Sequence, residues 1–182
     1  MGIRDKLPLL NSDKKGVRVA GYIMYAFIAL VVLDAILPAP DVEVGASTTA
    51  GVKYTDSDLD WLNWTTTQLL LIDDDLNRVS RSIEAGNPTV AMYAFEDLFK
   101  HAKVSQNLSS SMTVSKPLSA AKKEWESALE NYAQAGSYGY TGSRDLNTKD
   151  MDRASSYLDK ADDHLVKMKP LLDKGKADLG IS

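Results

Sequence analysis

A single apolar segment, residues 17–37, constrains this chain more than any other feature. It reads VRVAGYIMYAFIALVVLDAIL, and its two charged residues, Arg18 and Asp34, lie near its ends. A helix of this length rises about 30 Å, which matches the hydrocarbon core of a bilayer. The segment is apolar on every side, which is not typical of a helix that packs one face on a soluble core. It therefore predicts a transmembrane helix that contacts the lipid bilayer.

The charges around this segment predict its orientation. Basic residues dominate before it, and acidic residues follow it, with the first later lysine at Lys53: Arg4, Lys6, Lys14 and Lys15 precede it, and Asp41 and Glu43 come after. Because positively charged flanks stay in the cytoplasm, residues 1–16 are predicted to be cytoplasmic and the C-terminal domain extracytoplasmic. The segment would then be an uncleaved signal-anchor, and Asp34 an aspartate that reaches the headgroups.

Two alternative interpretations treat the segment as a processed leader. A cleaved signal peptide needs small residues soon after its apolar run, and Val44-Gly45-Ala46 would supply them, well beyond Leu37. The second interpretation is a pilin-type leader. Lys14-Lys15-Gly16 is similar to the site cut by archaeal prepilin peptidases, and this resemblance implies cleavage after Gly16. Arg18 departs from that pattern, as does the helical character of the chain that follows, because such pilins usually carry a β-rich head.

Beyond the apolar segment, the chain divides into a linker, one domain and a tail. Residues 38–55 mix proline, glycine, serine and threonine, which predicts a flexible or extended tether. Residues 56–175 have helical periodicity and almost no strand signal, and residues 176–182 form a short polar tail. The fold class is therefore predicted to be all-α, with an up-down four-helix bundle outside the membrane.

Four apolar stripes define the helices of this bundle. The first helix is expected from Asp56 to Gly86, the second from Asn87-Pro88, the third from Leu118 to Gly136, and the fourth from Asn147 or Thr148. Pro170 is expected to kink or fray the last turn of the fourth helix. The core positions that recur every three or four residues are Leu62, Thr65, Leu69, Ile72, Leu76, Val79, Ile83, Ala91, Ala94, Phe95, Leu98, Ala102, Leu108, Leu118, Ala121, Trp125, Ala128, Leu129, Tyr132, Met151, Ala154, Leu158, Ala161, Leu165, Met168 and Leu172.

The candidate binding residues lie in two places. Residues 136–147, GSYGYTGSRDLN, are predicted to be a long loop, and Tyr138, Tyr140 and Arg144 resemble the composition of binding surfaces. Trp61 and Trp64, near the start of the first helix, are interpreted as lying off the core and facing a partner, the headgroups or an end of the bundle. The alternative is that the tyrosines fold back onto the end of the bundle.

Metal and cofactor sites are not expected. Asp73-Asp74-Asp75 cannot converge on one ion from a helix; Asp74 and Asp75 are expected to be solvated, and Asp73 to edge the core. His101 and His164 are expected to be partly buried and satisfied by one hydrogen bond each. They lack the Glu-x-x-His pattern of two-iron bundles. A metal shared by the two histidines, or a haem held by His101 with Met151 or Met168, is the alternative.

Composition excludes several function classes. The chain has no cysteine, which excludes disulfides, thiolate metal sites and a cysteine nucleophile. Its net charge is −4, and no basic stripe is expected, so nucleic acid is not a predicted partner. Asn63 and Asn107 lie in Asn-x-Ser/Thr sequons and are glycosylation candidates. We find no catalytic motif, and an enzyme is not expected.

These observations predict that the protein is a membrane-anchored, non-enzymatic binding or assembly module for a membrane or cell-envelope partner. The alternative is an extracytoplasmic ligand-sensing module that signals through a membrane partner, since the architecture alone is similar to the four-helix sensory modules of chemoreceptors and sensor kinases. Such receptors usually carry a second span and a cytoplasmic output, and neither is expected from this sequence. A metal- or haem-binding bundle is the third possibility.

Overall fold

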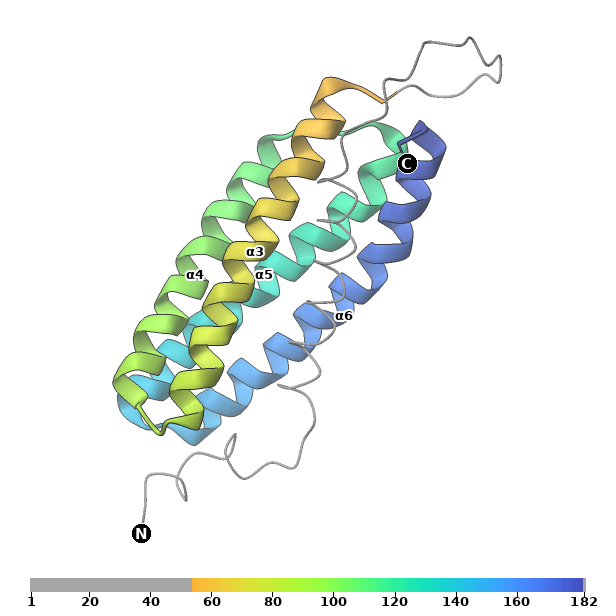
Figure 1. Cartoon of the computed structure of the whole chain (residues 1–182). Helices are drawn as coiled ribbons and strands as arrows, with labels where there is room; N and C mark the ends of the chain where they lie inside the picture. The colour runs from red at the N-terminus through yellow and green to blue at the C-terminus, as the bar shows by residue number, and fades with distance from the viewer. Residues whose placement is uncertain (1–53, 182) are drawn as a thin grey trace, which may run out of the picture.

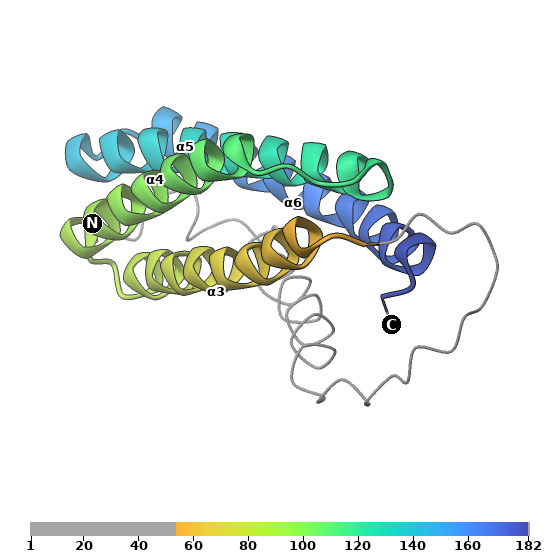
Figure 2. The same ribbon diagram turned by 90° about the horizontal axis from the view of Figure 1, so that it is seen from above.

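The computed structural model describes residues 54–181, which form four long helices (Figure 1). They are α3 (Asp56–Glu84), α4 (Pro88–Ser111), α5 (Lys116–Asp145) and α6 (Thr148–Leu179). Each helix packs against the next one in sequence, and neighbours run antiparallel (Figures 1 and 2). The predicted all-helical, four-helix fold is thereby confirmed for this part of the chain. The predicted segments 1–16 and 17–37, and nearly all of the linker 38–55, lie outside the described residues.

The beginning of α3 is fixed by a capping box. The Thr55 hydroxyl accepts a hydrogen bond from the Asp58 backbone N–H at 3.3 Å, and Asp58 Oδ2 accepts one from the Thr55 backbone N–H at 2.9 Å. Asp58 Oδ1 also accepts from the backbone N–H of Ser115 at 2.7 Å. Asp58 is fully buried, and it therefore joins the start of α3 to the connection between α4 and α5.

The short connections follow the local signals in the sequence. Gly86 has a φ of +64°, a conformation that glycine adopts without steric cost, and it ends α3 as predicted. Asn87 accepts a hydrogen bond from the Val90 backbone N–H at 3.1 Å, and Pro88 occupies the first turn of α4. Asn147 caps α6 in the same way, through the backbone N–H of Lys149.

The core consists of the apolar stripes of all four helices, with one exception. Leu108, predicted to be a core residue, is 47% exposed, because the inward positions in that part of α4 are the buried Ser105 and Ser109. The largest fully buried side chains of the core are Trp61, Trp125, Tyr132, Phe95, Leu69, Ile72, Leu98, Leu118, Leu129, Met151 and Met168. Alanines lie between these large residues at Ala91, Ala94, Ala102, Ala121, Ala128, Ala154 and Ala161, all at most 2% exposed. Alternation of large and small side chains lets the helices interdigitate at native packing density.

The third helix is about two and a half turns longer than predicted. It does not end at Gly136 but continues to Asp145, so the predicted loop 136–147 is almost entirely helical. The reason is tertiary packing. A Cβ at Gly136 would lie 2.7 Å from the Phe99 backbone nitrogen, and one at Gly139 would overlap the Phe95 ring. These glycines let α5 approach α4 closely, which a sequence pattern cannot distinguish from a helix end.

The fourth helix also runs further than the pattern indicates. Pro170 lies inside α6, which continues to Leu179, into the segment 176–182 that was predicted to be a polar tail. A Cβ at Gly175 would lie 2.7 Å from the Pro117 carbonyl oxygen, so this end of α6 packs tightly on the start of α5. Leu179 is 4% exposed and extends the core to the last turn.

Candidate functional site

The two tryptophans predicted to face a partner have different positions. Trp61 is 0% exposed and belongs to the core, so its interpretation as an exposed contact residue was wrong. The physical reason is its register: Trp61 lies four residues before Thr65 and eight before Leu69, on the inward stripe of α3. Trp64 is partly buried and packs against the edge of the core.

The other candidates lie on α5, and the structure does not gather them into one site. Tyr140 and Arg144 are one helical turn apart, with the Arg144 guanidinium 5.7 Å from the Tyr140 ring centre. Arg144 also pairs with Asp145 at 2.8 Å, and the carboxylate raises the pKa of the guanidinium above its usual range. Tyr138 lies on a different strip of α5, where it contacts α6.

Tyr138 is the centre of an aromatic and cationic surface. Its ring stacks on that of Tyr157 from α6, with ring centres 5.6 Å apart and planes within 5° of parallel. The Arg153 guanidinium lies 5.3 Å from the centre of the Tyr138 ring, and Lys160 Nζ lies 4.5 Å from that of Tyr157. We call Tyr138, Arg153, Tyr157 and Lys160 the tyrosine-cation surface. Each cation–π contact contributes about 0.5–1 kcal/mol at an exposed site, so the rings are held in place before any partner binds.

Three of these four residues were missed by the sequence reasoning. Arg153, Tyr157 and Lys160 follow one another at spacings of four and three on α6, so they share one strip of that helix. This spacing is a signal that the sequence contains. Only the antiparallel packing of α5 on α6, however, brings Tyr138 onto that strip.

The histidines bind carboxylates rather than each other. His101 Nδ1 lies 2.6 Å from Asp75 Oδ2 on α3, and His164 Nδ1 lies 2.7 Å from Glu124 Oε2 on α5. Asp75 is 1% exposed, so its predicted solvated position was wrong. Burial raises the pKa of Asp75, and the hydrogen bond from His101 opposes that rise. Among residues 54–181, no three histidine, aspartate or glutamate side chains are close enough to share a metal ion.

A second polar cluster lies where α3, α5 and α6 meet. The buried Tyr132 hydroxyl donates to Asp162 Oδ1 at 3.2 Å, and Asp73, which is 9% exposed, accepts from Asn77 Nδ2 at 3.1 Å. Burial raises the pKa of Asp73 and raises that of Asp162 to about 6, with Asp159 and Asp163 adding smaller repulsion at Asp162. The cluster therefore holds two carboxyl groups that ionise less readily than ordinary aspartates.

Replacing Asp162 with asparagine is expected to raise the free energy of unfolding at pH 7 by about 2 kcal/mol. The folded state binds this proton more tightly than the unfolded chain, whose carboxyl has the ordinary pKa of 3.8. The wild-type free energy of unfolding should consequently fall as pH rises from about 4 to about 6, and asparagine should remove that fall while still accepting from Tyr132. Urea unfolding at a series of pH values tests this. Asp152→Asn, at an exposed position of the same helix outside this cluster, is the control and should change stability by less than about 0.5 kcal/mol. An unchanged pH slope in Asp162→Asn would contradict the assignment.

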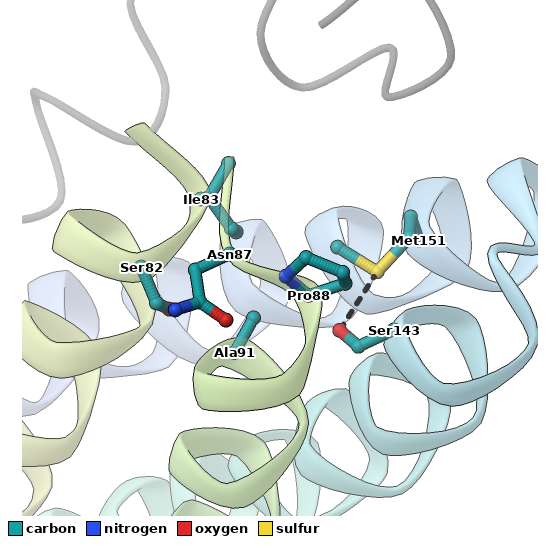
Figure 3. Close-up of a pocket in the computed structure, with 7 residues that line it drawn as sticks. All are labelled: Ser82, Ile83, Asn87, Pro88, Ala91, Ser143 and Met151. Carbon is teal, nitrogen blue, oxygen red and sulfur yellow. Dashed lines mark hydrogen bonds between the residues drawn. The ribbon is translucent and has the colours of Figure 1, made fainter. Parts of the chain in front are cut away.

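A small hollow lies where the end of α3, the beginning of α4, the end of α5 and the beginning of α6 meet (Figure 3). It is lined by Ser82, Ile83, Asn87, Pro88, Ala91, Ser143 and Met151. Ser143 Oγ donates to Met151 Sδ at 3.7 Å across it. The space inside is about 10 Å³, at most enough for one water molecule, so this hollow is not a substrate or cofactor pocket.

The two glycosylation candidates lie on the surface of the bundle. Asn63 on α3 and Asn107 on α4 are both exposed, and both lie within helices. None of the helices described between residues 54 and 181 is long and apolar enough to cross a membrane. The predicted span 17–37 lies outside these residues.

Comparison with known proteins does not place the chain in a family. The chain matches no protein family model, no curated protein and no solved structure.

Proposed function

We propose that this protein is a non-enzymatic binding module that is anchored in the membrane by residues 17–37, with its N-terminus in the cytoplasm and its helical bundle outside. In this proposal the bundle contacts a partner in the membrane or the cell envelope. Support for the anchor comes from the sequence: an uninterrupted apolar segment with basic residues before it and acidic residues after it. The anchor would hold the bundle at high local concentration near such a partner.

The tyrosine-cation surface is the observation that carries the binding role. Tyrosine and arginine are enriched at the energetically important centres of protein interfaces, because they bury large area at little entropic cost. Here the stack of Tyr138 on Tyr157 and the flanking Arg153 and Lys160 hold these groups in position beforehand. Such pre-organisation reduces the entropy lost on association.

Affinity purification of the full-length protein from native membranes in mild detergent tests this function. Co-purifying chains are identified by mass spectrometry, first for the wild type and then for the double variant Tyr138→Ala/Tyr157→Ala. We expect a stoichiometric partner whose recovery falls about 30-fold in the double variant, the effect of losing about 2 kcal/mol at an interface centre.

A matched control is available on α4. Tyr93 is 54% exposed and lies on a different helix from the tyrosine-cation surface. Tyr93→Ala should leave the recovery unchanged. Equal recovery from the double variant and the wild type would overturn the assignment of the surface, and recovery of the wild type without any partner chain would overturn a protein as the partner.

A further inference from the structure

The exposed cations of α6 form a straight row. Arg153, Lys160, Lys167 and Lys174 are spaced seven residues apart, which is almost two helical turns, so they lie along one strip about 30 Å long. All four are exposed. The sequence analysis expected no basic stripe, and this row corrects that expectation; α6 continues past Pro170 and so adds Lys174 to it.

Little in the described structure neutralises this row. Arg153 pairs with Asp150 at 3.1 Å, and Lys160 lies over Tyr157. Within residues 54–181, Lys167 and Lys174 make no ion pair and no side-chain hydrogen bond. Asp163 is one turn from both Lys160 and Lys167, and exposed Asp178 follows Lys174 by one turn at the end of the basic strip. An exposed acidic row, Asp152, Asp159 and Asp163, lies on the neighbouring strip of α6, further from α5. The face that includes the basic row is therefore the one shared with α5.

The α5 side of this face carries almost no negative charge. Glu124 and Tyr138 contact α6 and define the strip of α5 that borders the basic row. By helical spacing, the same strip contains Ser127, Asn131 and Gln134, which are uncharged, and Asp145, which pairs with Arg144 at 2.8 Å. Glu124 itself is bound to His164 at 2.7 Å. We call this surface, from Lys174 to Arg153 on α6 with the bordering strip of α5, the basic α5–α6 face.

We propose that the basic α5–α6 face lies on anionic lipid headgroups of the membrane when no partner protein occupies the tyrosine-cation surface, which is part of this face. This inference rests on the proposed function, because it needs residues 17–37 to anchor the chain. Each lysine or arginine near an anionic surface contributes about 1 kcal/mol, and tyrosine rings favour the interface between headgroups and water. A straight row of cations next to two tyrosines presents both kinds of group to a flat, phosphate-rich surface.

The geometry of the chain permits this contact along the full length of the bundle. The linker between the anchor and α3, residues 38–55, has 18 residues and spans at most about 65 Å. Helix α6 has 32 residues and is about 48 Å long. The bundle can therefore lie with its α5–α6 side on the same bilayer that holds the anchor.

The full-length chain, reconstituted into vesicles, tests this docking directly. Because the chain has no cysteine, a single Ser156→Cys in the basic row accepts one environment-sensitive fluorophore at a defined position. One vesicle contains phosphatidylcholine only, and the other also contains phosphatidylglycerol; both carry a lipid-bound quencher. We expect quenching only with phosphatidylglycerol, and its loss in molar salt, where the Debye length falls to about 3 Å.

Charge variants and a control label make the result decisive. The triple variant Lys160→Gln/Lys167→Gln/Lys174→Gln should lower the equilibrium constant for docking about a hundredfold, since each lysine contributes about fivefold. A fluorophore at Thr67→Cys, exposed on α3 and closer to the anchored end, should stay unquenched. Quenching that does not depend on phosphatidylglycerol, that persists in the triple variant, or that is equal at Thr67 would overturn the inference.

Flotation of the same vesicles separates this inference from the proposed function. A chain that floats with both lipids but shows no quenching at Ser156 is anchored without docking, so only this inference falls. A chain that does not float with phosphatidylcholine is not anchored, and the proposed function falls with it.

Discussion

Replacing Trp61 with alanine is expected to lower the free energy of unfolding by about 3–5 kcal/mol. The indole is 0% exposed and packs in the core, so truncation loses its buried apolar area and leaves a cavity that four long helices cannot fill. Urea unfolding of the full-length chain in mild detergent, followed by circular dichroism, measures the change.

Two further variants distinguish burial from other causes. Trp64→Ala, one turn along the same helix at the edge of the core, should cost less than about 2 kcal/mol. The Trp61 indole N–H has no hydrogen-bond partner in the described residues, so Trp61→Phe loses no bond and should cost less than about 1.5 kcal/mol. If Trp61→Ala kept wild-type stability and instead abolished partner recovery, the interpretation of Trp61 as a contact residue would be correct after all.

Replacing Gly136 with alanine is expected to destabilise the fold by about 2–3 kcal/mol, although alanine is the better helix former by about 1 kcal/mol. The added Cβ would lie 2.7 Å from the Phe99 nitrogen and 2.8 Å from the Phe95 carbonyl oxygen, both on the α4 backbone. Backbone atoms cannot move aside as a side chain does, so the two helices would have to separate.

The neighbouring residue provides the control for this prediction. Ser137 is exposed on the same turn of α5, and Ser137→Ala should be neutral or raise stability by a few tenths of a kcal/mol. Both variants are measured by the same urea unfolding experiment. A stabilising Gly136→Ala would mean that α5 does not approach α4 this closely, and the predicted loop would again be the better description of residues 136–147.

Local chemistry accounts for the parts of the fold that could be predicted. Helix beginnings at Asp56, Pro88 and Thr148 follow from side chains that accept hydrogen bonds from nearby N–H groups. The end of α3 follows from the positive φ of Gly86. These effects involve residues within a few positions of each other, so a single sequence is sufficient to predict them.

The candidate site was predictable only in part. Tyr138 was identified from its residue type, although its helical setting was wrong, and its partners Tyr157, Arg153 and Lys160 depend on the packing of α5 against α6. Similarly, Asp75 lies in an acidic run that the sequence alone assigns to solvent. Its burial depends on His101, which is 26 residues away in the chain.

The sequence by itself determined the four helices, most of their boundaries and the apolar stripes that they bury, because capping and helical periodicity act over a few residues. Only the tertiary structure decided that Gly136 and Gly139 continue a helix, that Trp61 is core while Trp64 is at the edge, and that Tyr138 of α5 lies beside the cations of α6. Each of these depends on which atoms of a neighbouring helix lie within a few ångströms, and that neighbour is distant in the chain.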